Sequence, residues 1–160
     1  MKTINISILN NYKGFRFNKK SRISKIFNKV FENIDINKKI DKKFKTAKTF
    51  LFDLVFTTDE EIKKVNNEYR GINKETDVIT FSLFADDENS FVVNDEINLG
   101  EIIVSVDTAK IQAKKTIEYE IDLLILHGIL HLLGFDHQTE EDYNFIVGIQ
   151  NKIMGEMYHA

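Results

Sequence analysis

The stretch Ile117-Glu-Tyr-Glu-Ile-Asp-Leu-Leu-Ile-Leu-His127-Gly-Ile-Leu-His131-Leu-Leu-Gly134-Phe-Asp136-His137 predicts a long helix that is apolar on most of its surface. A helix without a broad polar face must be buried on several sides, so we expect it at the centre of the fold. We expect this helix to begin after Thr116. Gly134 ends it, because glycine enters the left-handed conformation at no steric cost.

Three of the four histidines lie within the last eleven residues of this stretch. His127 and His131 are four residues apart, so a helix places both imidazoles on one face, and the turn at Gly134 can bring His137 to the same point. The alternative, that these are ordinary core or surface histidines, leaves their clustering unexplained. Three imidazoles leave a tetrahedral zinc ion one open position for water, which is typical of catalytic sites. We therefore predict one Zn²⁺ per chain, although three-histidine sites also accept other divalent transition metals.

Alternating apolar residues predict the strands of a sheet. Phe50, Phe52, Leu54 and Phe56, for example, share one face of an extended segment. The expected strands are 4–8, 50–56, 76–83 and 97–106, with an acidic loop between the last two.

Apolar residues at helical spacing predict about five helices. They are expected from 23 to 31, from a cap within Thr57–Glu61 to Arg70, from Asp107, across 117–133, and from Thr139 onward. In the second of these, Ile62, Val65 and Tyr69 form the expected buried stripe, and Gly71 ends the helix. Strand-helix-strand units followed by further strands and helices imply an α+β fold. We expect one layered domain over residues 1–160, with a mixed, roughly four-stranded sheet and the zinc site at the end of the central buried helix.

Composition sets outer bounds on the class of protein. A chain of 160 residues with 42% hydrophobic content suits one compact domain. It contains no cysteine, so metal ligands must come from His, Asp or Glu. The sequence has neither the apolar run of a signal peptide nor a long membrane-spanning segment. We therefore expect a cytoplasmic protein without a membrane partner.

The net charge of −3 is unevenly divided. Residues 1–70 carry 17 Lys and Arg against 8 Asp and Glu, whereas residues 71–160 carry 5 against 17. The basic half contains clusters of lysines that could bind a phosphate backbone. A solvated basic face is the simpler interpretation, because no signature of a single-strand-binding module accompanies these clusters. The clusters are Lys19-Lys20, Lys38-Lys39 and Lys42-Lys43-Phe44-Lys45.

An open zinc site could hydrolyse a peptide or a phosphodiester. The pattern His-x-x-x-His-x-x-Gly-x-x-His also occurs in zinc proteases, in which the residue after the first histidine is a glutamate that acts as general base. Here that residue is Gly128, which argues against a protease. Zinc itself lowers the pKa of bound water toward ~7, which suits attack on a phosphodiester equally well.

Several segments of the chain resemble those of a known family. The segment His127–His137 resembles the His-Gly-x-Leu-His-Leu-x-Gly-Tyr-Asp-His signature of YbeY endoribonucleases, with Phe135 in place of tyrosine. The chain reads Thr80-Phe81-Ser82 where the family commonly has Ser-Phe-Pro, which leaves the shape of that loop open. Other segments similar to the family's are Asn66-x-x-Tyr69-Arg70, Thr76-Asp77-Val78-Ile79-Thr80-Phe81 and Leu99-Gly100-Glu101-Ile102.

The resemblance implies a single-strand-specific, metal-dependent endoribonuclease that matures the 3′ end of 16S rRNA and takes part in ribosome quality control. It implies a cytoplasmic protein whose partners are ribosomal RNA and the small ribosomal subunit or its assembly factors. By the same resemblance His127, His131 and His137 bind zinc, and Arg70 and His127 are implicated in activity. The alternatives are a non-enzymatic, zinc-stabilised ribosome-assembly factor and a metalloprotease.

The chemistry of single residues agrees with these roles. The guanidinium of Arg70 suits a bidentate grip on a phosphate, although a surface arginine at a helix end is also common. Asp77 could order a turn or position Arg70, and Asp136 could accept a proton from a ligand imidazole or cap the glycine turn. We expect structural roles for both aspartates. Glu101 lies on a predicted strand, and we expect it to point to solvent.

Overall fold

A mixed sheet forms the frame of the molecule. The computed structural model describes residues 1–83, 92–93 and 95–158. Strands β1 (Thr3–Asn10), β2 (Thr49–Thr57), β5 (Glu96–Ser105) and β3 (Val78–Ser82) lie side by side in that order. The first three are parallel, β3 is antiparallel to β5, and the short β4 (Val92–Val93) pairs with the start of β5. The predicted mixed sheet with four main strands is therefore confirmed.

Seven helices lie within the described residues, five of them where the sequence predicts helices. The other two are short, and each depends on a side-chain cap rather than on a long apolar stripe. Asn33 Oδ1 accepts a hydrogen bond from the Ile36 amide (3.0 Å) at one, and Asp41 Oδ1 accepts from the Lys43 amide (3.0 Å) at the other. The helices are α1 (Lys20–Glu32), α2 (Ile34–Lys39), α3 (Lys42–Thr46), α4 (Asp59–Arg70), α5 (Val106–Gln112), α6 (Ile117–Leu132) and α7 (Glu140–Tyr158).

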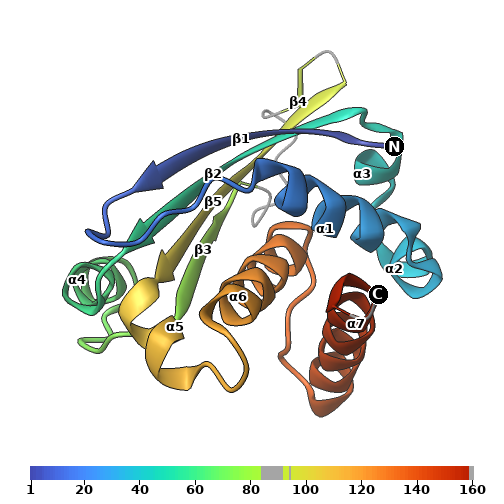
Figure 1. Cartoon of the computed structure of the whole chain (residues 1–160). Helices are drawn as coiled ribbons and strands as arrows, with labels where there is room; N and C mark the ends of the chain where they lie inside the picture. Colours follow the sequence, from blue (N-terminus) through green and yellow to red (C-terminus); the bar gives the residue numbers. More distant parts are fainter. Residues whose placement is uncertain (84–91, 94, 159–160) are drawn as a thin grey trace.

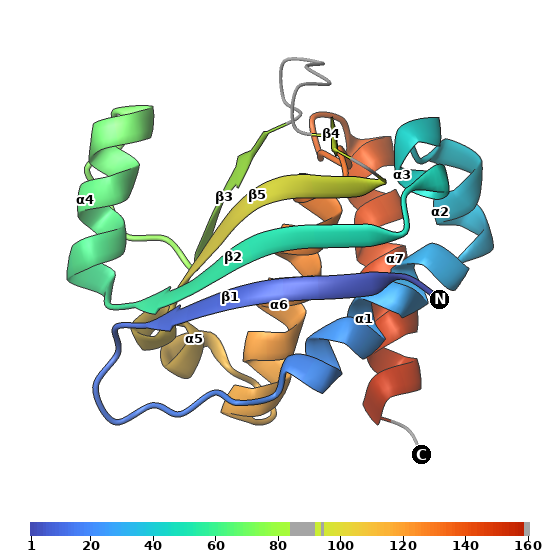
Figure 2. The ribbon, with the colours of Figure 1, turned by 90° about the horizontal axis from the view of Figure 1, so that it is seen from above.

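Helices α1, α6 and α7 lie on one side of the sheet (Figure 1). The apolar face of β2 predicted from the sequence points toward them and is buried, and the rings of Phe27 and Phe50 are 5.1 Å apart. Helix α4 lies apart from these three (Figure 2), where Ile62 packs with Ile79 and Ile103. In the second half of β5, Ile102 and Val104 thus pack in the core with α1, α6 and α7, whereas Ile103 packs with Ile62 of α4 on the other face of the sheet.

The predicted buried stripe of α4 is wrong at its last position. Ile62 is fully buried and Val65 is partly buried, but Tyr69 is 64% exposed. Its ring lies at the edge of the Phe81 ring, 5.2 Å away, on the outermost strand β3. The last turn of α4 therefore lies over the edge strand β3, and among the described residues the Tyr69 side chain stays largely uncovered.

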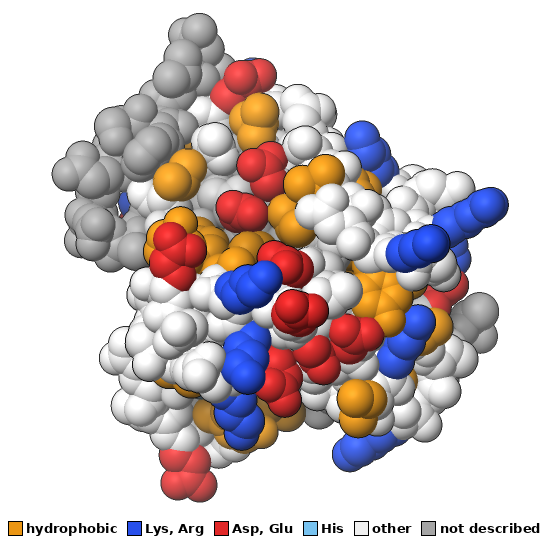
Figure 3. Space-filling view, turned by 90° about the vertical axis from the view of Figure 1, so that its left-hand side faces the viewer, with side chains coloured by type: hydrophobic (Ala, Val, Ile, Leu, Met, Phe, Trp, Pro, Cys, Tyr) orange, Lys and Arg blue, Asp and Glu red, His pale blue; other side chains and the backbone are white. Residues whose placement is uncertain are grey.

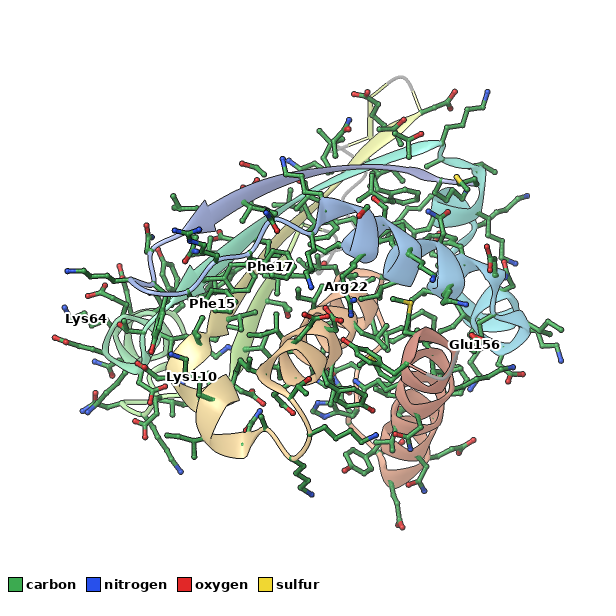
Figure 4. The ribbon with its side chains drawn as sticks, in the orientation of Figure 1. Phe15, Phe17, Arg22, Lys64, Lys110 and Glu156 are labelled. Atoms are coloured by element: carbon green, nitrogen blue, oxygen red, sulfur yellow. The ribbon has the colours of Figure 1, made fainter. Side chains whose placement is uncertain are left out.

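Helix α6 is central, as predicted, with ten of its sixteen residues buried. It even buries a charged group, because Asp122 is 1% exposed and contacts both Arg22 of α1 and Tyr158 of α7. Arg22 lies between α1 and α6 (Figure 4). This ion pair and the apolar core join α1, α6 and α7. No helix in the described ranges is long and apolar enough to cross a membrane.

Candidate metal centre

The last two turns of α6 and the turn that follows bring the three histidines together. Gly134 adopts a φ of +95°, so the left-handed turn predicted at this glycine is present. The Gly134 amide donates to the His131 carbonyl (3.0 Å), and the Phe135 amide donates to the Leu130 carbonyl (2.9 Å). These two bonds form a Schellman motif, which satisfies the final carbonyls of the helix and reverses the chain toward His137.

The three imidazoles converge. His127 Nε2 and His131 Nε2 are 2.9 Å apart, and one ligand atom from each of the three histidines lies within 4.8 Å of the others. At this separation the lone pairs of the two ring nitrogens can point at a common ion. Within the described part of the chain, this is the one group of three such side chains with this geometry. The residues therefore fit a divalent metal that prefers nitrogen ligands.

Their surroundings favour the neutral, metal-binding form of the imidazoles. Burial lowers the pKa of His127, and the nearby His137 lowers it further, whereas the charge of Asp77 raises it. For His131, burial and the two other histidines lower the pKa to about 4. A metal ligand must be deprotonated, so these shifts leave the site ready to bind an ion near neutral pH.

Gln150 of α7 is the residue that the sequence analysis missed. Its side-chain amide lies 2.7 Å from His127 Nδ1, and the residue is buried. When Nε2 binds a metal, Nδ1 carries the proton, and rotation of the amide lets Gln150 Oε1 accept it. The available signal was a polar residue on the apolar face of α7, four residues after Ile146.

The two aspartates have structural partners, as expected. Asp136 Oδ1 accepts from the His137 amide (2.8 Å) and Asp136 Oδ2 from Gln138 Nε2 (3.0 Å), so this carboxylate caps the turn. Asp77 Oδ2 accepts from Gln112 Nε2 (3.0 Å), and the Asp77 carbonyl accepts from the Ser105 amide (2.9 Å). These contacts hold the loop after α4 against both ends of α5, through Ser105 at its start and Gln112 at its end.

Glu101 lies outside the centre. It pairs in register with Asp53 on β2, while the next residue, Ile102, contacts Gly128 of α6. Neighbouring residues on a strand point to opposite faces, so Glu101 faces away from α6. Burial raises the pKa of Glu101, and the charge of Asp53 raises it further.

Arg70 is the last residue of α4 and is exposed. Gly71 follows with a φ of +69°, which ends the helix as predicted. The charge of Arg70 contributes to the lowered pKa of His131, so the guanidinium lies within electrostatic reach of the histidine centre. Arg70 thus influences His131, although more than fifty residues separate the two in the sequence.

Gly128 has a packing reason to be glycine. A Cβ at this position would lie 2.9 Å from two side-chain carbons of Ile102. Helix α6 therefore approaches β5 so closely that any side chain here would force Ile102 to shift. A glutamate in this position, as zinc proteases have, does not fit this packing.

The family follows from a comparison with known sequences. A sequence model described as "Endoribonuclease YbeY" matches residues 7–158. The chain belongs to the YbeY family. This confirms the resemblance seen in the histidine motif.

Individual YbeY relatives agree. "Endoribonuclease YbeY" of Caldicellulosiruptor bescii is 34% identical over 143 residues, which cover 84% of this chain and 89% of the relative. That of Bacillus pumilus is 42% identical over 110 residues, covering 64% and 69%. That of Gloeobacter violaceus is 39% identical over 104 residues, and the match spans 54% of its length.

A solved structure has a similar fold. The solution structure of TM1509 from Thermotoga maritima is 26% identical in sequence, with a TM-score of 0.56. The match covers 96% of this chain and 89% of that one. The similarity in fold therefore extends over nearly the whole of this chain.

Proposed function

We propose that the protein is a metal-dependent endoribonuclease that cleaves single-stranded RNA in the cytoplasm. Its proposed task is maturation of the 3′ end of 16S rRNA and ribosome quality control, in contact with the small ribosomal subunit or its assembly factors. Membership of the YbeY family supports the RNA substrate. The observation that carries the proposal is the convergence of three imidazole ligand atoms within 4.8 Å of one another. The charge of Arg70 also lowers the pKa of His131.

His127, His131 and His137 would hold the metal, for which we propose zinc. Held there, a divalent ion would supply Lewis acidity beside the phosphodiester. Arg70 would bind two nonbridging oxygens of the phosphate and stabilise the charge that grows on them during attack. Burial keeps His127 and His131 neutral, and Gln150 orients the His127 ring.

The test is cleavage of an end-labelled RNA that carries the single-stranded 3′ tail of the small-subunit RNA. Metal-loaded wild type should cut it internally, and chelated wild type should regain activity when zinc is added. His131→Ala should abolish cleavage, and Arg70→Ala should reduce it about 10²- to 10³-fold, as expected for loss of one charge-stabilising group. Lys63→Ala, an exposed residue on the same helix as Arg70, is the matched control and should keep full activity.

Equal cleavage by every preparation would identify a contaminating nuclease and contradict the proposal. The protein would then be better described as a zinc-stabilised assembly factor that binds RNA without cutting it. In the expected case, the chemical ends of the products identify the nucleophile, because water leaves a linear phosphate and a ribose 2′-hydroxyl leaves a cyclic one.

A further inference from the structure

A pocket of about 300 Å³ lies beside the first turns of α6, whereas the histidines lie in its last turns. Its walls come from the loop between β1 and α1, from Lys110 of α5 and from the start of α6. His127 follows Ile117, which lines the pocket, by ten residues, or about 15 Å along the helix axis at 1.5 Å per residue. The pocket is therefore separate from the metal centre.

Two phenylalanine rings form much of the apolar wall, and the fold holds them in place. Phe15 and Phe17 both pack on the buried Phe56, with ring centres 5.1 and 4.9 Å from its own. Asn10 fixes the loop that carries them, because its Nδ2 donates to the Phe15 carbonyl (2.6 Å) and its Oδ1 accepts from the Tyr12 amide (3.0 Å). The two rings lie between this loop and α5 (Figure 4). The pocket is thus shaped by the fold itself, as small-molecule sites usually are.

Basic groups outnumber acidic groups around the pocket. Arg16, Lys19 and Lys110 line it, and Glu118 is the one acidic residue among its described lining residues. Glu118 is already paired with two cations, because its Oε2 lies 2.6 Å from Lys19 Nζ and its Oε1 lies 3.0 Å from Arg22 Nη1. The charges of Arg16 and Lys110 are therefore left over on the pocket wall.

The surroundings of Lys110 leave its charge available. Its Nζ lies 4.7 Å from the centre of the Tyr12 ring and 3.4 Å from the Tyr12 hydroxyl, and a cation–π contact does not neutralise an ammonium group. Asp107 attracts Lys110, but the two oxygens of that carboxylate already accept from the Tyr12 hydroxyl (2.6 Å) and from the Asp59 amide (2.9 Å). Lys110 is also exposed, so an anion can reach it.

We propose that this pocket binds a nucleoside monophosphate, whose base would contact the two phenylalanine rings and whose phosphate would contact Arg16 and Lys110. Aromatic rings stack on bases, and unpaired cations at the rim suit a phosphate. A volume of about 300 Å³ is at the lower end for small-molecule sites, which suits one nucleotide rather than a segment of a partner protein. A free nucleotide and the 5′ end of an RNA present the same groups. On the side of the molecule where α4 lies, by contrast, acidic side chains gather between the basic ones, which disfavours an anion there (Figure 3).

The test is isothermal titration calorimetry of the whole chain with adenosine 5′-monophosphate, in the metal-loaded and the chelated form. Both forms should bind the nucleotide alike, because the pocket lies away from the histidines. Adenosine and inorganic phosphate should each bind about tenfold more weakly, since each makes only part of the contacts. A 5′-phosphorylated RNA dinucleotide is titrated into the chelated form. Tighter binding of the dinucleotide would identify an RNA end as the natural ligand, and equal binding would identify a free nucleotide.

The variant Arg16→Gln/Lys110→Gln should weaken nucleotide binding about tenfold, because it removes two charge-assisted contacts to the phosphate. Arg16→Lys/Lys110→Arg keeps both charges and should stay within about threefold of the wild type. The matched control is Lys25→Gln/Lys63→Gln, which changes two exposed lysines outside the pocket and should bind like the wild type. Thermal unfolding checks that each variant is folded.

Absence of nucleotide binding by the wild type would overturn the assignment. So would unchanged affinity in a folded glutamine variant, an equal loss in the control pair, or equal affinities for inorganic phosphate and the nucleotide. Binding that requires the metal would assign the phosphate to the histidine centre instead. Nucleotide binding does not depend on RNA cleavage, so this inference and the proposed function can fail separately.

Discussion

The Gln150 side-chain amide lies 2.7 Å from His127 Nδ1, so α7 contacts a candidate metal ligand on α6 through a single buried polar group. The two residues are 23 positions apart and lie on different helices. Outer partners of this kind hold the orientation and tautomer of a ligand imidazole.

Gln150→Ala should therefore weaken zinc binding about 10- to 100-fold, because the His127 ring loses the partner that orients it. The measurement is the apparent Kd for zinc by competition with a chromophoric chelator. Gln150→Glu keeps an acceptor for Nδ1–H and should bind zinc at least as tightly as the wild type. Equal affinity in Gln150→Ala and wild type would show that the contact does not support the ligand.

Zinc should stabilise the folded chain, since the ligands converge only in the native state. At a free zinc concentration of about 100 times Kd, the expected gain is about 2.7 kcal/mol. His137→Ala should abolish this gain in thermal unfolding. His137 is exposed, so the metal-free variant should unfold at nearly the wild-type temperature. A zinc-dependent shift that survives in His137→Ala would exclude this residue as a ligand.

Gly128→Ala should destabilise the protein by about 1 to 3 kcal/mol, because the new Cβ would lie 2.9 Å from Ile102 carbons in a close-packed layer. Urea unfolding gives the free energy. Gly148→Ala on α7 is the control, because no heavy atom lies within 4 Å of a Cβ placed there. It should be stabilised by about 0.5 to 1 kcal/mol through helix propensity alone. Stabilisation of both variants would show that α6 and β5 separate easily.

Arg22→Met should cost about 2 to 4 kcal/mol, because it leaves the buried Asp122 carboxylate without its cation. Lys29→Met removes a more exposed ion pair with Glu156, at 3.6 Å, and should change stability by less than about 1 kcal/mol. Adding Asp122→Leu to Arg22→Met should recover much of the loss in urea unfolding. If the double variant is no more stable than Arg22→Met, the loss of stability comes from lost packing rather than from the uncompensated charge.

Glu120 and Glu118 should change the pH dependence of the free energy of unfolding in opposite directions. Burial raises the pKa of Glu120 above its usual 4.5, although a hydrogen bond from Gln112 lowers it in part. The contribution of Glu120 to the free energy of unfolding is therefore present below pH 4.5 and is lost as the pH rises through the pKa of the folded state. Glu120→Gln should thus become more stable than wild type as the pH rises from 4 to 7. The hydrogen bond from Lys19 lowers the pKa of Glu118, so Glu118→Gln should become less stable over the same range. Urea unfolding at several pH values measures both, and parallel curves would contradict the assignment.

The central helix and its histidines could be predicted from the sequence because short-range geometry determines them. Residues four apart share a helix face, and Gly134 permits the left-handed turn toward His137 whatever surrounds it. The alternation along β2 likewise identifies its buried face without knowledge of its neighbours.

Tertiary packing decided the rest. The approach of Gln150 to His127, the reach of Arg70 to His131 and the pocket between the β1–α1 loop and α6 each join segments that are distant in the chain. The exposure of Tyr69 has the same origin, since its helical spacing predicts burial but the sheet ends beneath it. Periodicity reports which face of an element is apolar, whereas contacts between elements depend on how several such faces pack at once.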